Sequence, residues 1–190
     1  VGAVSRAIRA GDMDIGIAGG VESMSRAPFV MPKADTAFSR NNQVYDTTIG
    51  WRFVNPKMKA QYGIDSMPET ADNVAADYNV SRADQDAFAA RSQARWEAAQ
   101  AAALFADEIK PIIIPQRRGA PLEVSRDEHP RPGTTVEKLA GLRGINGPDL
   151  TVTAGNASGV NDGAAALLLA SEEAAARNGQ TPMARIVAMS

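Results

Sequence analysis

Cysteine is absent from this sequence of 190 residues, so the chain can form neither a disulfide nor a thiolate metal site. A charge surplus is also missing, because 20 Lys and Arg residues stand against 22 Asp and Glu residues and leave a net charge of -2. That balance argues against nucleic acid or an anionic membrane as the main partner. No apolar run approaches the roughly 18 residues that a membrane span requires.

What the sequence does contain is the composition of a globular domain. Apolar residues make up 44% and charged residues 22% of the chain, which argues against wholesale disorder. The length suffices to bury the core of one ordinary domain. No internal repeat of the solenoid kind is visible.

The most informative stretch is TVTAGNASGVNDGAAALLLAS, which runs from Thr151 to Ser171. Residues 151–153 predict a short strand, and the apolar run at 163–170 predicts a second, buried strand. The small residues between them let the backbone approach a ligand or another backbone closely. Two interpretations follow, a ligand loop or a tight turn between buried strands. A phosphate-binding P-loop is excluded, because no Lys-Ser or Lys-Thr pair follows the glycines.

The first 25 residues predict a helix followed by a strand. Val4 and Ile8 have helical spacing, and Gly11 stands where a helix ends. Residues 14–20 then predict a short buried strand, so this order indicates a βαβ pattern and a largely parallel sheet. The polar residues 22–25 after it are either a ligand loop or a plain strand end.

The middle of the chain combines a weakly periodic region at 26–63 with helices and short strands. Ser66 and Glu69 have the spacing of a capping box and predict the start of a helix. A second helix is predicted over 82–104, with Ser81 as N-cap and a narrow apolar stripe at Phe88, Trp96 and Ala99. An edge strand within 109–115 and a returning strand at 122–125 follow. The last predicted elements are a helix over 136–142 capped by Thr135, a helix from Ser171 through Arg177 and a strand from Arg185.

Two segments in the same order, AGGVESMSRAP at 18–28 and TVTAGNASGVNDGAAALLLAS, resemble the signature segments of the thiolases. The resemblance covers essentially the whole chain and implies an α/β fold. The chain would comprise part of the N-terminal βαβ half of a thiolase with its inserted α+β loop domain, and it would be truncated at both ends. The implied parts are N-terminal core at 1–25, loop domain at 26–150, and a return to the core at 151–190.

The resemblance also implies where the chemistry lies. Thiolases use a nucleophilic cysteine, expected here before Val1, and a histidine and second cysteine, expected after Ser190. The chain would then hold no catalytic residue and could not turn over as written. His129 is the only histidine, but it lies between acids and prolines, which is typical of a solvated turn and not of the family's catalytic His motif.

The part present would bind coenzyme A, as a substrate and not as a covalent cofactor, without a metal. Arg131 matches a family arginine that reaches the CoA nucleotide; the alternative is a surface salt bridge with Glu128 or Asp127. The remaining residues implied to contact CoA are Ser158 and Ala154 at the pantetheine, Met67 beside it, and Glu137 and Lys138 at the polar head.

Two longer segments, GWRFVNPKMKAQYGIDSMPETADNVA and RDEHPRPGTTVEKLAGLR, most resemble thiolases that cleave 3-oxoadipyl-CoA in bacterial breakdown of aromatic compounds. Ser66 stands where acetoacetyl-CoA thiolases have a histidine. A dicarboxylic acyl chain would need a cation; the nearest are Arg52, Lys57 and Lys59, which otherwise are solvated or subunit-contact charges.

Several alternatives stay open. They are a broad 3-ketoacyl-CoA thiolase of fatty acid metabolism, an acetoacetyl-CoA thiolase, a non-catalytic CoA- or lipid-binding module, and an assembly fragment. The resemblance further implies a cytoplasmic bacterial protein that forms a homo-oligomer, with a tetramer expected.

Overall fold

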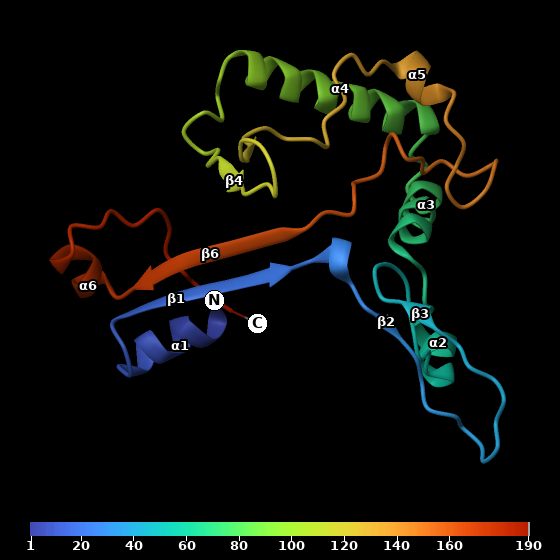
Figure 1. The fold of residues 1–190 in the computed structure, drawn as a ribbon, viewed down its shortest axis with the longest axis horizontal. Coiled ribbons are helices and arrows are strands. Elements are labelled where there is room, and N and C mark those ends of the chain that lie inside the picture. Colours follow the sequence, from blue (N-terminus) through green and yellow to red (C-terminus); the bar gives the residue numbers. More distant parts are fainter. Residues whose placement is uncertain (190) are drawn as a thin grey trace. The chain divides into compact units, whose positions relative to one another are not determined.

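The computed structural model describes residues 1–189, which form two compact units (Figure 1). Unit 1 comprises residues 1–30 and 160–190, and unit 2 comprises residues 31–159. The sequence predicted the divisions at 25/26 and 150/151, so the observed divisions lie five and nine residues later. Ser190, the last residue of the predicted 151–190 part, lies outside the described residues.

Unit 1 begins with the predicted helix, α1 (Gly2–Ala10). Gly11 ends it in the left-handed conformation at φ +82°, and its N–H donates to Ile8 O. A residue with a side chain rarely adopts this φ, which explains the glycine. Helix α1 lies close over β1 (Ile15–Glu22), since a Cβ at Gly16 would come within 2.6 Å of Val4 Cγ1.

Strand β1 pairs along its full length with β6 (Gly163–Ala170), and the two strands run antiparallel (Figure 1). The predicted parallel arrangement is therefore wrong for this pair. The reason is geometric: the chain leaves β1 at Glu22 and returns to the same end at Gly163, which is the partner of Glu22. A strand that starts at the end where its neighbour stops must run back along it.

Both strands were predicted to be buried, and this prediction is also wrong. Only Ala18 and Leu169 are buried in the ribbon, whereas Ile17 and Val21 are 73% and 79% exposed. Side chains alternate between the two faces of the ribbon: α1 packs on the face of Gly16 and Ala18, whereas Ile17 and Val21 point to the opposite face and stay exposed. The buried apolar residues that follow are Ala174 and Ala175 in α6 (Glu172–Arg177).

The remaining pieces of unit 1 are short. A single 3-10 turn, η1 (Met24–Arg26), and β2 (Phe29–Val30) follow β1. Ser171 caps α6 as predicted. The strand predicted from Arg185 is not formed, because the carbonyl of Ile186 accepts a hydrogen bond from the side chain of Arg9 at 2.6 Å and not from a neighbouring strand.

Unit 2 starts with loop, β3 (Tyr45–Asp46) and α2 (Pro56–Tyr62), a helix that the weak periodicity of 26–63 did not indicate. Asn55 caps α2 by accepting from the N–H of Lys57 at 2.9 Å, and proline occupies the first position. An Asn-Pro pair is a helix-start signal that could have revealed α2. The Tyr45 and Phe53 rings meet edge to face at 5.4 Å.

Two longer helices follow, α3 (Met67–Asp77) and α4 (Arg82–Ala101), both capped by the predicted serines. Ser66 and Glu69 form the predicted capping box. The predicted apolar stripe of α4 is wrong at Phe88, which is 62% exposed, whereas Trp96 and Ala99 are half-buried and the fully buried residue of this helix is Asp86. A polar network takes up the buried face of α4.

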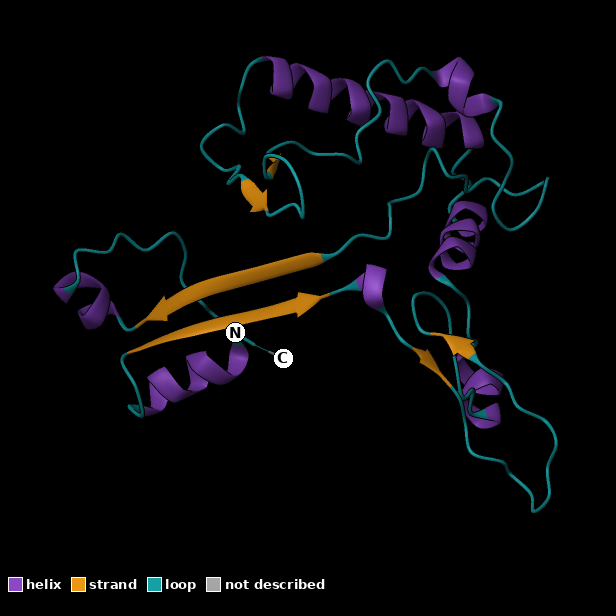
Figure 2. Ribbon diagram, viewed as in Figure 1, coloured by secondary structure: helices purple, strands orange, loops and turns teal. Residues whose placement is uncertain are grey.

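The last elements of unit 2 are short, and loops join them (Figure 2). Strands β4 (Ile112–Ile114) and β5 (Leu122–Val124) form the predicted antiparallel pair. Helix α5 (Val136–Ala140) carries the predicted Thr135 cap and ends two residues earlier than expected. Residues 151–153 form no strand, only a single antiparallel bridge between Thr153 and Gly144. None of the helices within 1–189 has the length and apolarity to span a membrane.

Candidate functional site

The framework of the candidate site in unit 2 starts at Asp72, a buried residue of α3. One carboxylate oxygen, Oδ1, accepts from the backbone N–H groups of Thr151 and Val152 at 2.9 and 3.0 Å. The other oxygen accepts from Asn146 Nδ2 at 2.8 Å. Burial raises the pKa of Asp72, but these hydrogen bonds outweigh it and leave the pKa below its ordinary value. Asp72 thus fastens α3 to the start of the signature segment as a carboxylate.

A second buried aspartate, Asp86 in α4, is 1% exposed and lies at the centre of a second network. Its Oδ2 accepts from Arg82 Nε at 2.7 Å, and its Oδ1 accepts from Asn156 Nδ2 at 3.0 Å. Arg82 Nη2 in turn donates to the carbonyls of Leu139 and Leu142 at 2.7 and 3.1 Å. The network therefore joins α4, the end of α5 and the glycine-rich loop.

The glycine-rich loop also packs directly on the α5 segment. A Cβ on Gly155 would clash with the terminal methyl groups of Leu139 and Leu142. Leu139 is 4% exposed and Thr153 is fully buried, so the contact belongs to the small core of unit 2. Glycine is needed at 155 because of this close approach, which supports the interpretation of the loop as closely packed against its neighbour.

Arg131, the predicted phosphate contact, lies in the turn before α5 and is exposed. Its Nη1 donates to the backbone carbonyls of Glu128 and His129 at 2.8 and 2.9 Å. The backbone N–H of Arg131 donates to Gln93 of α4 at 2.9 Å, which ties the turn to that helix. The alternative, a salt bridge of Arg131 with Glu128 or Asp127, is not formed. Arg131 donates to the backbone carbonyl of Glu128, and the Asp127 carboxylate accepts from Trp96 Nε1 at 3.2 Å.

Lys138 and Glu137 follow on the first turn of α5 and are exposed. Lys138 Nζ donates to Gly133 O at 2.7 Å, so two cations, Lys138 and Arg131, are anchored to one turn. Hydrogen bonds from its own N–H and from Thr135 lower the pKa of Glu137. Fixed cations with exposed faces suit the phosphates of a nucleotide.

Met67, Ala154 and Ser158 complete the predicted CoA set, and all three are exposed, Met67 at 77%. Met67 stands at the first position of α3. Ala154 and Ser158 flank Gly155 and Asn156, so the packing on α5 brings their loop next to the segment that carries Glu137 and Lys138. Asp72 connects the helix of Met67 to the start of the same loop.

The other residues considered from sequence have local roles. His129 is exposed, and its carbonyl serves the Arg131 turn. Ser66 caps α3, and Arg52 Nη1 donates to Gly50 O at 3.0 Å. Lys57 and Lys59 are exposed on α2. Within the described residues, no three His, Cys, Asp or Glu side chains gather as a metal site would require.

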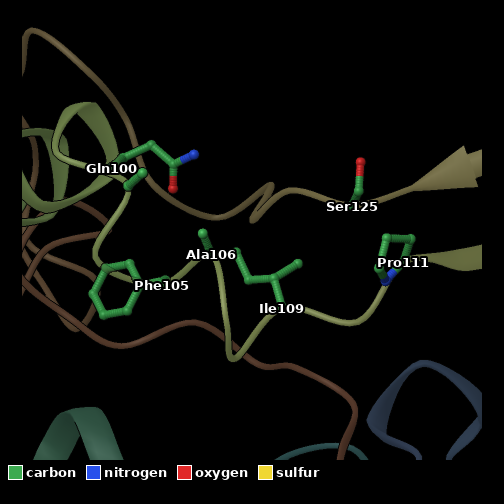
Figure 3. Close-up of a pocket in the computed structure, with 7 residues that line it drawn as sticks. Gln100, Phe105, Ala106, Ile109, Pro111 and Ser125 are labelled. Carbon is green, nitrogen blue, oxygen red and sulfur yellow. The ribbon is translucent and has the colours of Figure 1, made fainter.

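A pocket of about 260 Å³ lies elsewhere in unit 2, after the end of α4 (Figure 3). Phe105, Ala106 and Ile109 line its middle, with Gln100 on one side and Pro111 and Ser125 on the other. It contains no ionisable side chain and none of the six predicted CoA contacts, so it does not suit a phosphate ligand.

In unit 1, the polar end of β1 is joined to the signature segment by a hydrogen-bonded pair. Asp162 accepts from Ser25 N at 2.8 Å and from Ser25 Oγ at 2.7 Å. These two hydrogen bonds lower the pKa of Asp162, and hydrogen bonds from Met24 and Ser23 lower it further by a smaller amount. The two segments that resemble family signatures therefore contact each other here.

Residues 1–173 match the family described as "Thiolase, N-terminal domain". The chain belongs to the thiolase family. It is 66% identical, over its whole length, to a β-ketoadipyl-CoA thiolase of Pseudomonas aeruginosa, of which it covers 47%. It is 47% identical to an acetyl-CoA acetyltransferase of Chromobacterium violaceum, over 96% of the chain and 45% of that protein.

The fold agrees with solved thiolase structures. A crystal structure of human mitochondrial 3-ketoacyl-CoA thiolase in complex with CoA matches with a TM-score of 0.77 at 35% identity, over 95% of this chain and 43% of that one. The chain thus spans about half the length of the thiolases it matches. Membership of this family confirms the mixed α/β class that was predicted from the sequence.

The sequence interpretation missed the residues that build the framework, namely Asp72, Asp86, Arg82 and Asn156. A signal for two of them was available. Arg82 and Asp86 stand four apart on a strongly predicted helix, and charged residues at that spacing can pair. Nothing local indicated that Asp86 is buried or that its partner is Asn156, 70 residues further on.

Proposed function

We propose that this chain carries the CoA-binding residues of a thiolase that cleaves 3-oxoadipyl-CoA with CoA to succinyl-CoA and acetyl-CoA. The observation that supports this substrate is the difference in sequence identity, which is 66% to a protein named for this substrate and 47% to an acetyl-CoA acetyltransferase. Ser66, in place of the histidine expected of acetoacetyl-CoA thiolases, supports the same choice.

In this proposal CoA lies on the exposed side of the framework. Arg131 and Lys138, both anchored to the turn before α5, face the phosphates, and Glu137 takes a polar contact at the head. Ala154 and Ser158 line the pantetheine, with Met67 packed beside it. The human thiolase solved with CoA supports CoA as the ligand of this fold.

The chemistry of the proposed reaction requires a cysteine, which these 190 residues do not contain. A thiolate attacks the 3-oxo carbonyl, the bond between C2 and C3 breaks, and acetyl-CoA leaves as its enolate is protonated. The CoA thiolate then attacks the succinyl thioester and releases succinyl-CoA. Residues outside this chain would supply the nucleophile and the proton donors, and a cytoplasmic homotetramer is part of the proposal.

The test has two arms. Titration of CoA into the 190-residue chain should give saturable binding. The product of the complete coding region should cleave 3-oxoadipyl-CoA with a kcat/KM at least about tenfold above that for acetoacetyl-CoA. Preference for acetoacetyl-CoA would overturn the substrate. CoA binding without any thiolysis by the complete product would favour the non-catalytic CoA-binding module instead. Light scattering of the complete product tests the tetramer.

A further inference from the structure

Both oxygens of the Asp86 carboxylate are used, and each holds a different part of unit 2. Oδ2 binds Arg82, whose Nη2 donates to the carbonyls of Leu139 and Leu142 at the end of α5. Oδ1 binds Asn156, whose own Oδ1 accepts from Thr153 N at 2.7 Å. One buried side chain therefore connects α5 to the glycine-rich loop.

The chemistry of the two partners requires a carboxylate at position 86. Arg82 Nε and Asn156 Nδ2 are both donors, so the group between them must accept on both of its terminal atoms. An ionised aspartate does so. An asparagine amide offers one acceptor oxygen and one NH2 group, which would set a donor against either Arg82 or Asn156. Because the site is buried, an unpaired donor there is costly.

The two parts that Asp86 joins are those on which the proposed CoA contacts lie. Glu137 and Lys138 belong to α5, and Ala154 and Ser158 lie two residues before and two residues after Asn156, the loop residue that bonds to Asp86. Asp86 is 1% exposed, so it does not itself offer a surface to a ligand. The contact of Gly155 with Leu139 lies between the same two parts and depends on their relative position.

We propose that Asp86 is a positioning residue for CoA binding, which sets the glycine-rich loop against α5 through Asn156 on one oxygen and Arg82 on the other. This inference rests on the proposed function, because CoA is the ligand whose contacts it aligns. A displacement of the loop by about 1 Å or less moves the contacts on the loop away from those on α5 and weakens CoA binding.

The test compares Asp86→Asn with the wild-type chain. CoA dissociation constants are measured by calorimetry well below the unfolding temperature, and the Gly155–Leu139 and Gly155–Leu142 contacts are measured as nuclear Overhauser effects. We expect Asp86→Asn to bind CoA about tenfold more weakly and to lose or weaken both contacts. The control is Ser171→Ala, which removes the cap of α6 in unit 1 and should change neither quantity.

Should Asp86→Asn fail to fold, Asn156→Ala replaces it, because this change keeps the Arg82–Asp86 pair and removes the bond of the loop to Asp86, together with the bonds of Asn156 to Thr151 and Thr153. Unchanged CoA affinity with intact Gly155 contacts in the variant would overturn the inference and leave the proposed function standing. Absence of CoA binding by the wild-type chain would overturn the proposed function. The Gly155 contacts would then still decide whether Asp86 positions the loop.

Discussion

Ser25 and Asp162, 137 residues apart, form two hydrogen bonds of 2.8 and 2.7 Å at the end of the β1–β6 ribbon. The neighbouring pair in the register is Glu22 with Gly163, so the bonds close the ribbon just beyond its last paired residues. At the opposite end, Arg177 binds Asp14 at 2.8 Å, and Ser171 N donates to Asp14 O at 2.9 Å. Side-chain bonds thus close both ends.

We expect Asp162→Ala to open only the end of the ribbon at Glu22 and Gly163. Removal of the acceptor leaves Ser25 without its partner, whereas the end at Ile15 and Ala170 keeps its own bonds. Hydrogen exchange of individual amides measures this, with faster exchange near Val21 and little change near Gly16. Asp14→Ala is the matched control and should reverse the pattern. Equal exchange along the whole ribbon in Asp162→Ala would contradict the prediction.

The low pKa of Asp72 predicts a pH dependence of stability. The folded protein binds this proton less readily than the unfolded chain, so stability from Asp72 is fully present above the ordinary value of 3.8 and is lost as the pH falls through the lower folded pKa. Asp72→Asn should cost about 2 kcal/mol near pH 7, because it disrupts hydrogen bonds to a buried carboxylate. The cost should shrink below about pH 4.

Urea unfolding of the two proteins between pH 3 and pH 7 measures this difference. Asp65→Asn is the control: Asp65 is exposed and accepts one side-chain bond, from Asn73, so its replacement should change the unfolding free energy little at any pH. A cost of Asp72→Asn that stays the same from pH 3 to pH 7 would show that the charge of Asp72 does not stabilise the fold.

Gly155→Ala should destabilise unit 2 by about 1–3 kcal/mol, because the new methyl group must displace Leu139 and Leu142. It should also weaken CoA binding, since the loop cannot keep its position. Gly163→Ala is the control, because a Cβ there meets no atom within 4 Å, and it should stay within about 0.5 kcal/mol of wild type. Thermal unfolding measures the change in stability, and CoA titration measures the change in affinity. Equal effects of the two variants would contradict the packing argument.

Arg131→Gln should weaken CoA binding about tenfold at low ionic strength, because one cation facing the phosphates is lost. The difference from wild type should decrease in 1 M salt, where charges separated by more than about 3 Å are screened. Arg117→Gln makes the same change of net charge in the β4–β5 turn and should leave the affinity unchanged. A similar loss in both variants would indicate a general effect of net charge, and no specific contact of Arg131.

The sequence by itself determined the local structure and the family. The caps at Ser66, Ser81, Thr135 and Ser171 start helices where they were predicted, since a cap acts on N–H groups two or three residues away. The two signature segments sufficed for the thiolase resemblance. An overlooked local signal, Asn55 before Pro56, accounts for the missed helix α2.

Tertiary structure alone decided the direction of β6, the exposure of both ribbon strands and the burial of Asp72 and Asp86. Each depends on contacts between residues about 70 to 150 positions apart, such as Asp86 with Asn156 or Ile15 with Ala170. No short-range propensity encodes where a chain returns. A buried aspartate is stable only when its donors arrive from other segments, so its role becomes visible once those segments are in place.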